Sequence, residues 1–177
     1  MAKFLLIFIT VLLFSSSNAE EIYGEAKIID GDTIHIKFFK IRLEGIDAPE
    51  IKQKCKKKYL KISTTPVMKK IINPKIVGIN FDKDYSCGIV SKKQLAKKIN
   101  NVKISCISST KDKYKRYLAT CYKKNINLNK WMVRNGHAVA YKRYSKQYVN
   151  DENYAKKNKL GIWQGQFIRP EKWRKLN

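Results

Sequence analysis

The chain has 177 residues, and its 38 Lys and Arg against 14 Asp and Glu give a formal net charge of +24 at pH 7. This length supports one domain with a real core and argues against a second full domain. The charge favours a polyanionic partner such as nucleic acid, anionic lipid or acidic glycan, although lysines that only solvate the surface would give the same balance. With only two histidines, a histidine-based metal site is disfavoured.

Residues 1–19 have the layout of a secretory signal peptide. One early lysine, Lys3, precedes an apolar run from Phe4 to Phe14, and small residues end the segment at Ala19. The run is shorter than the roughly 20 residues that a membrane-spanning helix needs, so an uncleaved anchor is the weaker alternative. We expect cleavage after Ala19, a mature chain of residues 20–177 with a charge of about +23 (24 minus Lys3), and a secreted or periplasmic monomer without stable membrane association.

Residues 20–50 predict two or three antiparallel strands. Ile34, Ile36 and Phe38 alternate with polar residues, and a second apolar run covers 41–46. We expect turns at 30–31 and near 39–40. Residues 51–86 contain a lysine-rich run and two prolines, which predicts a long loop with little regular structure. Ser91 and Gln94 then form a capping-box pattern, so a short amphipathic helix is expected to begin there.

Four cysteines in an exported protein predict two disulfides, because none of their spacings is the short Cys-x-x-Cys of a zinc or redox site. Residues 102–123 read as a β-hairpin. Pairing Cys106 with Cys121 gives an index sum of 227, which centres its turn between Lys113 and Tyr114 in a polar stretch. Among the three possible connectivities we therefore prefer Cys106–Cys121 and Cys55–Cys87. Helices are expected from Leu128 to about 135 and over 149–160.

Asp32, Asp47 and Glu50 lie within nineteen positions, with Arg42 between them. This set suits phosphodiester chemistry. Carboxylates can hold a hard divalent cation that neutralises phosphate charge, a guanidinium can grip two phosphate oxygens, and a free carboxylate can orient or deprotonate water. Each acidic segment alone is an ordinary turn, so the combination carries the prediction.

At these residues the chain resembles the staphylococcal nuclease (thermonuclease-like) family. The matching segments are "DGDTIHI", "IRLEGIDAPE", "DKYKRYLA", "INLNKWMVRNGHAVAY" and "YAKKNKLGIW", in the family's order, and they cover most of the chain from Ile28 to Trp163. The four cysteines and the C-terminal segment are similar to an exported bacterial branch. The resemblance implies an α+β fold, a five-stranded OB-type β-barrel with about three α-helices. It also implies a calcium-dependent, sugar-nonspecific endonuclease acting on DNA and RNA.

The resemblance also implies roles for individual residues. Asp32 and Asp47 would be carboxylate ligands of calcium, and Ala48 would supply a backbone carbonyl where the founding enzyme has threonine. Glu50 would orient or deprotonate water, and Arg42 would grip the phosphate.

Further along the chain, Arg116 would be the second catalytic arginine. Lys113, Tyr114 and Tyr141 would lie near the bound nucleotide, where aromatic rings can stack on any base. Two features depart from the family's pattern: Lys115 stands where glycine is usual, and the segment between Glu50 and Cys87 is long.

The rival interpretations are a non-catalytic OB-fold module that binds nucleic acid and a basic envelope protein that binds anionic lipid or glycan.

Overall fold

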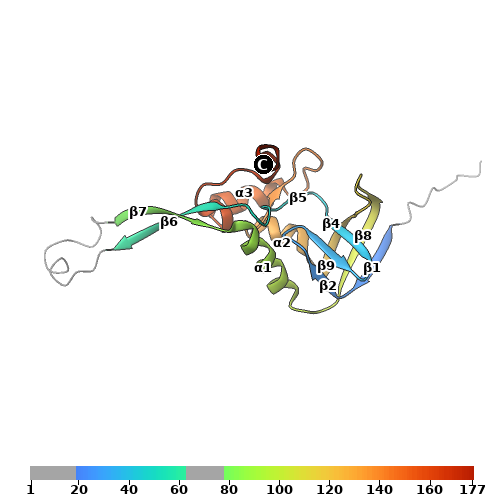
Figure 1. Cartoon of the computed structure of the whole chain (residues 1–177). Coiled ribbons are helices and arrows are strands. Elements are labelled where there is room, and N and C mark those ends of the chain that lie inside the picture. Colours follow the sequence, from blue (N-terminus) through green and yellow to red (C-terminus); the bar gives the residue numbers. More distant parts are fainter. Residues whose placement is uncertain (1–18, 63–77) are drawn as a thin grey trace, which may run out of the picture.

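Seven strands form the main sheet in a computed structural model, which describes residues 19–62 and 78–177. The sheet runs β1-β8-β9-β4-β3-β2, with β10 added to β9, and it curls into a nearly closed barrel (Figure 1). Its strands are β1 (Glu20–Gly24), β2 (Ala26–Ile28), β3 (Thr33–Ile36), β4 (Phe39–Leu43), β8 (Ile104–Lys111), β9 (Tyr117–Lys123) and β10 (Ile126–Asn127). The α+β class and the OB-type barrel are confirmed, and the described part of the chain has four α-helices where about three were expected.

The barrel core follows the apolar alternation of β3 and β4. Ile34, Ile36, Ile41 and Leu43 are at most 1% exposed, and the two strands pair with Thr33 opposite Arg42. The turn between them lies at 37–38, two residues before the predicted position. Phe38 therefore lies in the turn and is 86% exposed, so it does not continue the alternation of Ile34 and Ile36.

The β8–β9 hairpin confirms the predicted register around the disulfide. Cys106 lies directly opposite Cys121 and is bonded to it. An irregularity between Ser108 and Thr110 shifts the pairing by one residue toward the tip. The turn then occupies 112–116, which is where the polar stretch predicted it.

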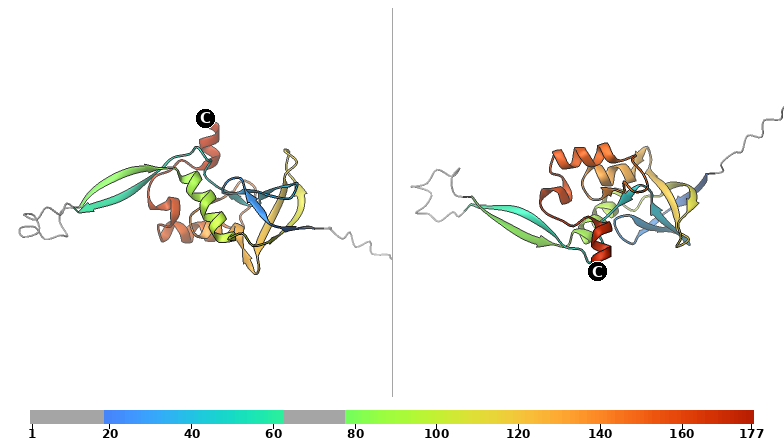
Figure 2. Two further views of the ribbon diagram at one scale, coloured as in Figure 1. Left: turned by 60° about the horizontal axis from the view of Figure 1, so that its bottom comes forward. Right: turned by 90° about the horizontal axis from the view of Figure 1, so that it is seen from above.

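Strands β6 (Cys55–Ile62) and β7 (Gly78–Tyr85) correct the expectation of an irregular loop over 51–86. They pair antiparallel with Cys55 opposite Tyr85, and Figures 1 and 2 show the two strands projecting away from the barrel. The predicted disulfide between Cys55 and Cys87 closes the base of this hairpin. The base is also tied to the C-terminal region by two backbone hydrogen bonds between Lys56 and Gln166, of 2.8 and 3.1 Å.

Three helices pack beside the barrel: α1 (Cys87–Ile99), α2 (Leu128–Arg134) and α3 (Val149–Lys157). Helix α1 begins four residues before the predicted start at Ser91. Ser91 therefore lies within the helix and not at its start. Its hydroxyl donates a hydrogen bond to the His137 carbonyl at 2.7 Å and does not cap the helix N-terminus. Helix α2 is capped by the Asn127 side chain, which accepts a hydrogen bond from the Lys130 N–H.

The chain ends in two elements that the sequence did not predict. A 3₁₀ helix, η2 (Gly161–Gln164), is followed by α4 (Pro170–Leu176), which begins with proline at its first position. The short strands β5 (Ile46–Asp47) and β11 (Val139–Ala140) pair antiparallel, with Val139 opposite Asp47.

Within residues 19–62 and 78–177, none of the helices is long and apolar enough to cross a membrane. The predicted signal peptide lies outside the described residues except for Ala19.

Candidate active site

Two acidic side chains meet at the guanidinium of Arg42, which lies on β4. Asp32 comes from the turn before β3 and forms an ion pair with Arg42. Asp47 ends β5 and accepts a hydrogen bond from Arg42 Nη2 at 3.1 Å. The same nitrogen donates to the Ile46 carbonyl at 3.2 Å. The structure thus brings together three of the residues that the sequence singled out.

The loop that carries Asp32 is fixed by its own hydrogen bonds. Asp30 Oδ1 accepts from the N–H groups of Asp32 (2.9 Å) and Thr33 (2.6 Å), as in an Asx turn. Asp32 Oδ2 accepts from the Ala48 N–H at 2.6 Å. At Gly31 a Cβ would lie 2.0 Å from the Ser91 hydroxyl, so only glycine lets this loop approach α1. These contacts hold the Asp32 carboxylate against the β5 segment.

Glu50 is positioned by Gln53, a fully buried residue that the sequence analysis did not single out. Gln53 Oε1 accepts from the Glu50 N–H at 3.2 Å, and the Gln53 N–H donates to the Glu50 carbonyl at 2.8 Å. A Cβ at Gly88 would lie 1.8 Å from that carbonyl, so the first turn of α1 packs directly on this loop. The Glu50 side chain remains 33% exposed and accessible to water.

Arg174 of α4 is the second guanidinium on these carboxylates. Its Nη1 donates to Asp47 Oδ1 at 2.9 Å and to Glu50 Oε1 at 2.7 Å, and its Nη2 donates to Asp47 Oδ2 at 3.1 Å. The sequence did not indicate this residue, because the contact joins positions 127 apart and α4 itself was not predicted.

The electrostatics of the cluster are set by burial and by crowding of like charges. The side chains of Arg42 and Asp47 are 11% and 1% exposed. Burial lowers the pKa of Arg42 from its ordinary value, Asp47 opposes that shift, and the positive charges of Arg116 and Arg174 add to it. For Arg174, burial is outweighed by the hydrogen bonds that its guanidinium donates to Asp47 and Glu50, which raise its pKa. Both arginines are cations at neutral pH.

Arg116 lies near this cluster but is paired elsewhere. Its Nε and Nη2 bind Asp112 Oδ2 at 2.8 and 2.7 Å. Burial of Asp112 is outweighed by hydrogen bonds from the backbone N–H and then the side chain of Arg116, which lower its pKa. Lys115, which replaces the family's usual glycine, has φ of +62°, so this turn keeps the left-handed backbone that glycine favours. The positive charge of Arg116 is close enough to lower the pKa of Arg42, whereas the Arg116 side chain donates its hydrogen bonds to Asp112.

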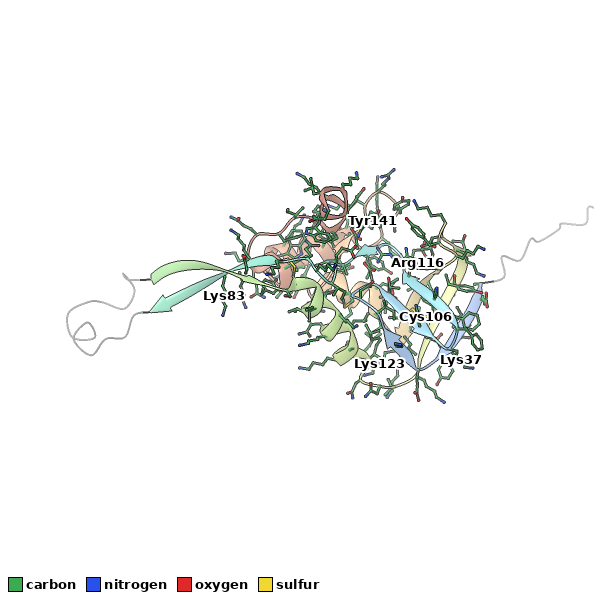
Figure 3. All side chains as sticks on the ribbon, in the orientation of Figure 1. Lys37, Lys83, Cys106, Arg116, Lys123 and Tyr141 are labelled. Carbon is green, nitrogen blue, oxygen red and sulfur yellow. A yellow bond between two sulfur atoms is a disulfide. The ribbon has the colours of Figure 1, made fainter. Side chains whose placement is uncertain are left out.

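The three predicted substrate contacts lie at two places. Tyr114, at the tip of β8–β9, is 66% exposed, with the Lys113 ammonium 5.0 Å from its ring centroid. Tyr141 packs edge-on against Tyr144 with ring centroids 4.8 Å apart. Burial raises the pKa of Tyr141, and the nearby charge of Asp47 adds to the shift. Figure 3 shows Arg116 and Tyr141 on the side of the molecule where α4 lies, with Lys123 on the opposite side.

Comparison with known proteins decides the family. Residues 40–165 match the family described as "Staphylococcal nuclease homologue", which is more than half of the chain. The protein belongs to the staphylococcal nuclease family.

Relatives in this family carry several names. A protein of Rhizobium meliloti named "Succinoglycan biosynthesis protein ExoI" is 30% identical over 84% of this chain and 68% of its own length. An "Uncharacterized endonuclease" of Haemophilus influenzae is 29% identical over 96% of this chain and 82% of its own length. A "Probable staphylococcal-like nuclease CAN3" of Oryza sativa subsp. japonica is 25% identical over 81% of this chain and 30% of its own length.

The donor chemistry of the site fits the calcium that the nuclease family implies. Asp32, Asp47 and the backbone of Ala48 offer the hard oxygen ligands that calcium takes, and Arg42 and the Ala48 N–H hold the two carboxylates at one place. Among the described residues, no group of three or more His, Cys, Asp and Glu is arranged to hold a metal. In this arrangement guanidinium groups contact Asp32, Asp47 and Glu50.

Proposed function

We propose that this member of the nuclease family is an exported, calcium-dependent endonuclease that hydrolyses phosphodiester bonds of both DNA and RNA. The observation that carries the proposal is a cluster of three carboxylates: Asp32 and Asp47 meet at buried Arg42, and Arg174 joins Asp47 to Glu50. A protein that only binds nucleic acid needs basic and aromatic groups at its surface. It has no need for three carboxylates, which repel phosphate.

In the proposed reaction, Glu50 accepts a proton from a water molecule while the water oxygen attacks phosphorus. The bond from phosphorus to the leaving oxygen breaks, and that oxygen takes up a proton from solvent, to which Glu50 afterwards releases the proton that it accepted. Arg42 and Arg116 donate hydrogen bonds to the non-bridging oxygens as their negative charge grows. For this, Arg116 exchanges its contact with Asp112 for the phosphate.

Asp32, Asp47 and the Ala48 carbonyl would hold calcium beside the phosphate. When bound, the ion would neutralise part of the negative charge of the phosphate. Lys113, Tyr114 and Tyr141 would contact the nucleotide, and stacking on the tyrosine rings is independent of base identity.

Export is proposed from the signal-like residues 1–19 and from the cysteines. Both disulfides join cysteines of the predicted mature chain, and such bonds persist in oxidising compartments. The proposal includes a monomer that is secreted or periplasmic.

The test is incubation of oxidised residues 20–177 with single- and double-stranded DNA and with RNA, in calcium or in a calcium chelator. The proposal predicts cleavage of all three substrates in calcium and none with chelator. Tight binding without cleavage would favour the non-catalytic module. Cleavage that persists in chelator would refute the calcium requirement alone.

A further inference from the structure

The C-terminal helix α4 is docked so that one of its side chains reaches the carboxylate cluster. Arg169, just before α4, binds the buried Glu152 carboxylate at 3.1 Å and the Ala140 carbonyl at 3.0 Å. The Ile168 carbonyl accepts from Gln53 Nε2 at 2.7 Å, and Pro170 is buried. Gln53 also holds Glu50, so the same residue positions both the Glu50 loop and the start of α4.

Arg174, near the far end of this helix, binds both carboxylate oxygens of Asp47. Both oxygens of Asp47 accept from its guanidinium in a bidentate pair, and Oδ1 accepts from Arg42 as well. Bidentate pairs of arginine and carboxylate are among the stronger hydrogen-bonded pairs in proteins. Glu50 Oε1 accepts the remaining bond, at 2.7 Å.

These contacts conflict with the proposed function, on which the present inference rests. A divalent cation on Asp47 would share its oxygens with a guanidinium of like charge, and the same guanidinium holds Oε1 of Glu50. We propose that Arg174 is a built-in competitor for calcium. It and calcium bind Asp47 in mutually exclusive arrangements, and release of Arg174 from Asp47 and Glu50 accompanies calcium binding.

Release is feasible because Arg174 lies at the exposed end of α4. Its side chain is 34% exposed, Leu176 beyond it is 62% exposed, and the anchors of the helix lie at residues 168–170. The side chain can therefore turn into solvent while the start of the helix stays docked. By linkage, the factor by which calcium weakens the Arg174 contact equals the factor by which Arg174 weakens calcium.

The test measures calcium affinity directly, by isothermal titration of oxidised residues 20–177 without nucleic acid. Arg174→Gln removes the competing charge and keeps much of the side-chain stem. Lys175→Gln is the matched control, because it removes the same charge from the next residue of α4, whose ammonium lies only near Glu171, at 3.8 Å. We expect Arg174→Gln to bind calcium about ten- to a hundredfold more tightly than the wild type, in the range of typical coupling energies, and Lys175→Gln to change affinity less than about threefold.

A second measurement uses thermal unfolding of the same proteins. Calcium should raise the Tm of Arg174→Gln more than that of the wild type at equal concentration, because tighter binding to the folded state stabilises it more. Equal calcium affinity in the wild type and Arg174→Gln, or weaker affinity in Arg174→Gln, would overturn the inference. That result would leave the proposed nuclease function intact if the wild type cleaves nucleic acid in calcium. Absence of calcium binding in all three proteins would overturn both the inference and the calcium requirement.

Discussion

Replacing Glu152 by glutamine is expected to destabilise the protein by about 2 kcal/mol at neutral pH. Glu152 is fully buried on α3, and its carboxylate accepts from Arg169 at 3.1 Å and from the Ala140 N–H at 2.9 Å. Lys142 and Lys156 contact it at 3.0 and 2.9 Å. Glutamine preserves the size of the side chain but leaves these three cations without their shared counter-ion.

The magnitude follows from the pKa of Glu152. Burial of the carboxyl group is outweighed by hydrogen bonds from Arg169, Lys156 and Lys142, which lower its pKa from 4.5 to about 2. Each pKa unit corresponds to about 1.4 kcal/mol, so the shift amounts to roughly 3 kcal/mol. The cationic side chains are 39–45% exposed, so solvent screening reduces the expected loss to about 2 kcal/mol.

The effect has a defined pH dependence. Because the folded-state pKa lies below the unfolded value, the stabilisation is present above pH 4.5 and is lost as the pH falls toward 2. The difference in stability between wild type and Glu152→Gln should therefore be full at pH 7 and below about 1 kcal/mol at pH 2.5.

Urea unfolding of both proteins at the two pH values measures this difference. Glu171→Gln is the matched control, since Glu171 on α4 makes only partly exposed pairs with Arg143 and Lys175 and should lose less than about 1 kcal/mol. A loss for Glu152→Gln no larger than that control, or an equal loss at pH 7 and pH 2.5, would refute the reasoning.

Three further predictions concern the core, the disulfides and the charge of the surface. Asn129→Ala should cost at least about 2 kcal/mol in urea unfolding, because the buried Asn129 amide satisfies backbone groups of Cys121, Glu44 and Ala119; Asn135→Ala, which removes one partly buried contact in the same region, should cost less than about 1 kcal/mol. Replacing Cys106 and Cys121 together by alanine should cost roughly 3 kcal/mol in urea unfolding, since that disulfide closes a short loop. In the wild type, peptide mapping without reduction should find no Cys55–Cys106 link. Nucleic-acid affinity measured by filter binding should fall steeply with salt, because lysines and arginines displace counterions from phosphates; a salt-independent affinity would contradict this.

The sequence predicted those elements whose pattern is local. The alternation at Ile34 and Ile36 predicted which face of β3 is buried, and the index sum of Cys106 and Cys121 predicted the hairpin register. The structure confirms both. Hairpin β6–β7 was missed because its first strand is largely lysine and its partner lies across 63–77. Its base is held by a disulfide and by hydrogen bonds to Gln166. The alternation of apolar residues, from which strands were predicted, gives no sign of such contacts.

The start of α1 was missed for a related reason. Ser91 has the spacing of a cap, but tertiary packing of Gly88 on the Glu50 backbone extends the helix to Cys87. The Ser91 hydroxyl instead donates a hydrogen bond to the His137 carbonyl.

At the site, the nearness of Asp32, Arg42 and Asp47 could be predicted because strand pairing brings these chain neighbours together. The contact of Arg174 with Asp47 could not, since it depends on how the C-terminal segment docks through Arg169 and Gln53. No spacing in the sequence indicates that docking.

The most direct test of the proposed catalytic site is the turnover of Glu50→Gln with DNA in saturating calcium. The substitution keeps the size of the side chain and removes the charge that would take a proton from water. Positioned acid–base groups contribute about a hundred- to ten-thousandfold, so turnover should fall on that scale while nucleic-acid binding and thermal stability change little. A Glu50→Gln protein that cleaves as fast as the wild type would contradict the assignment of Glu50 as the base.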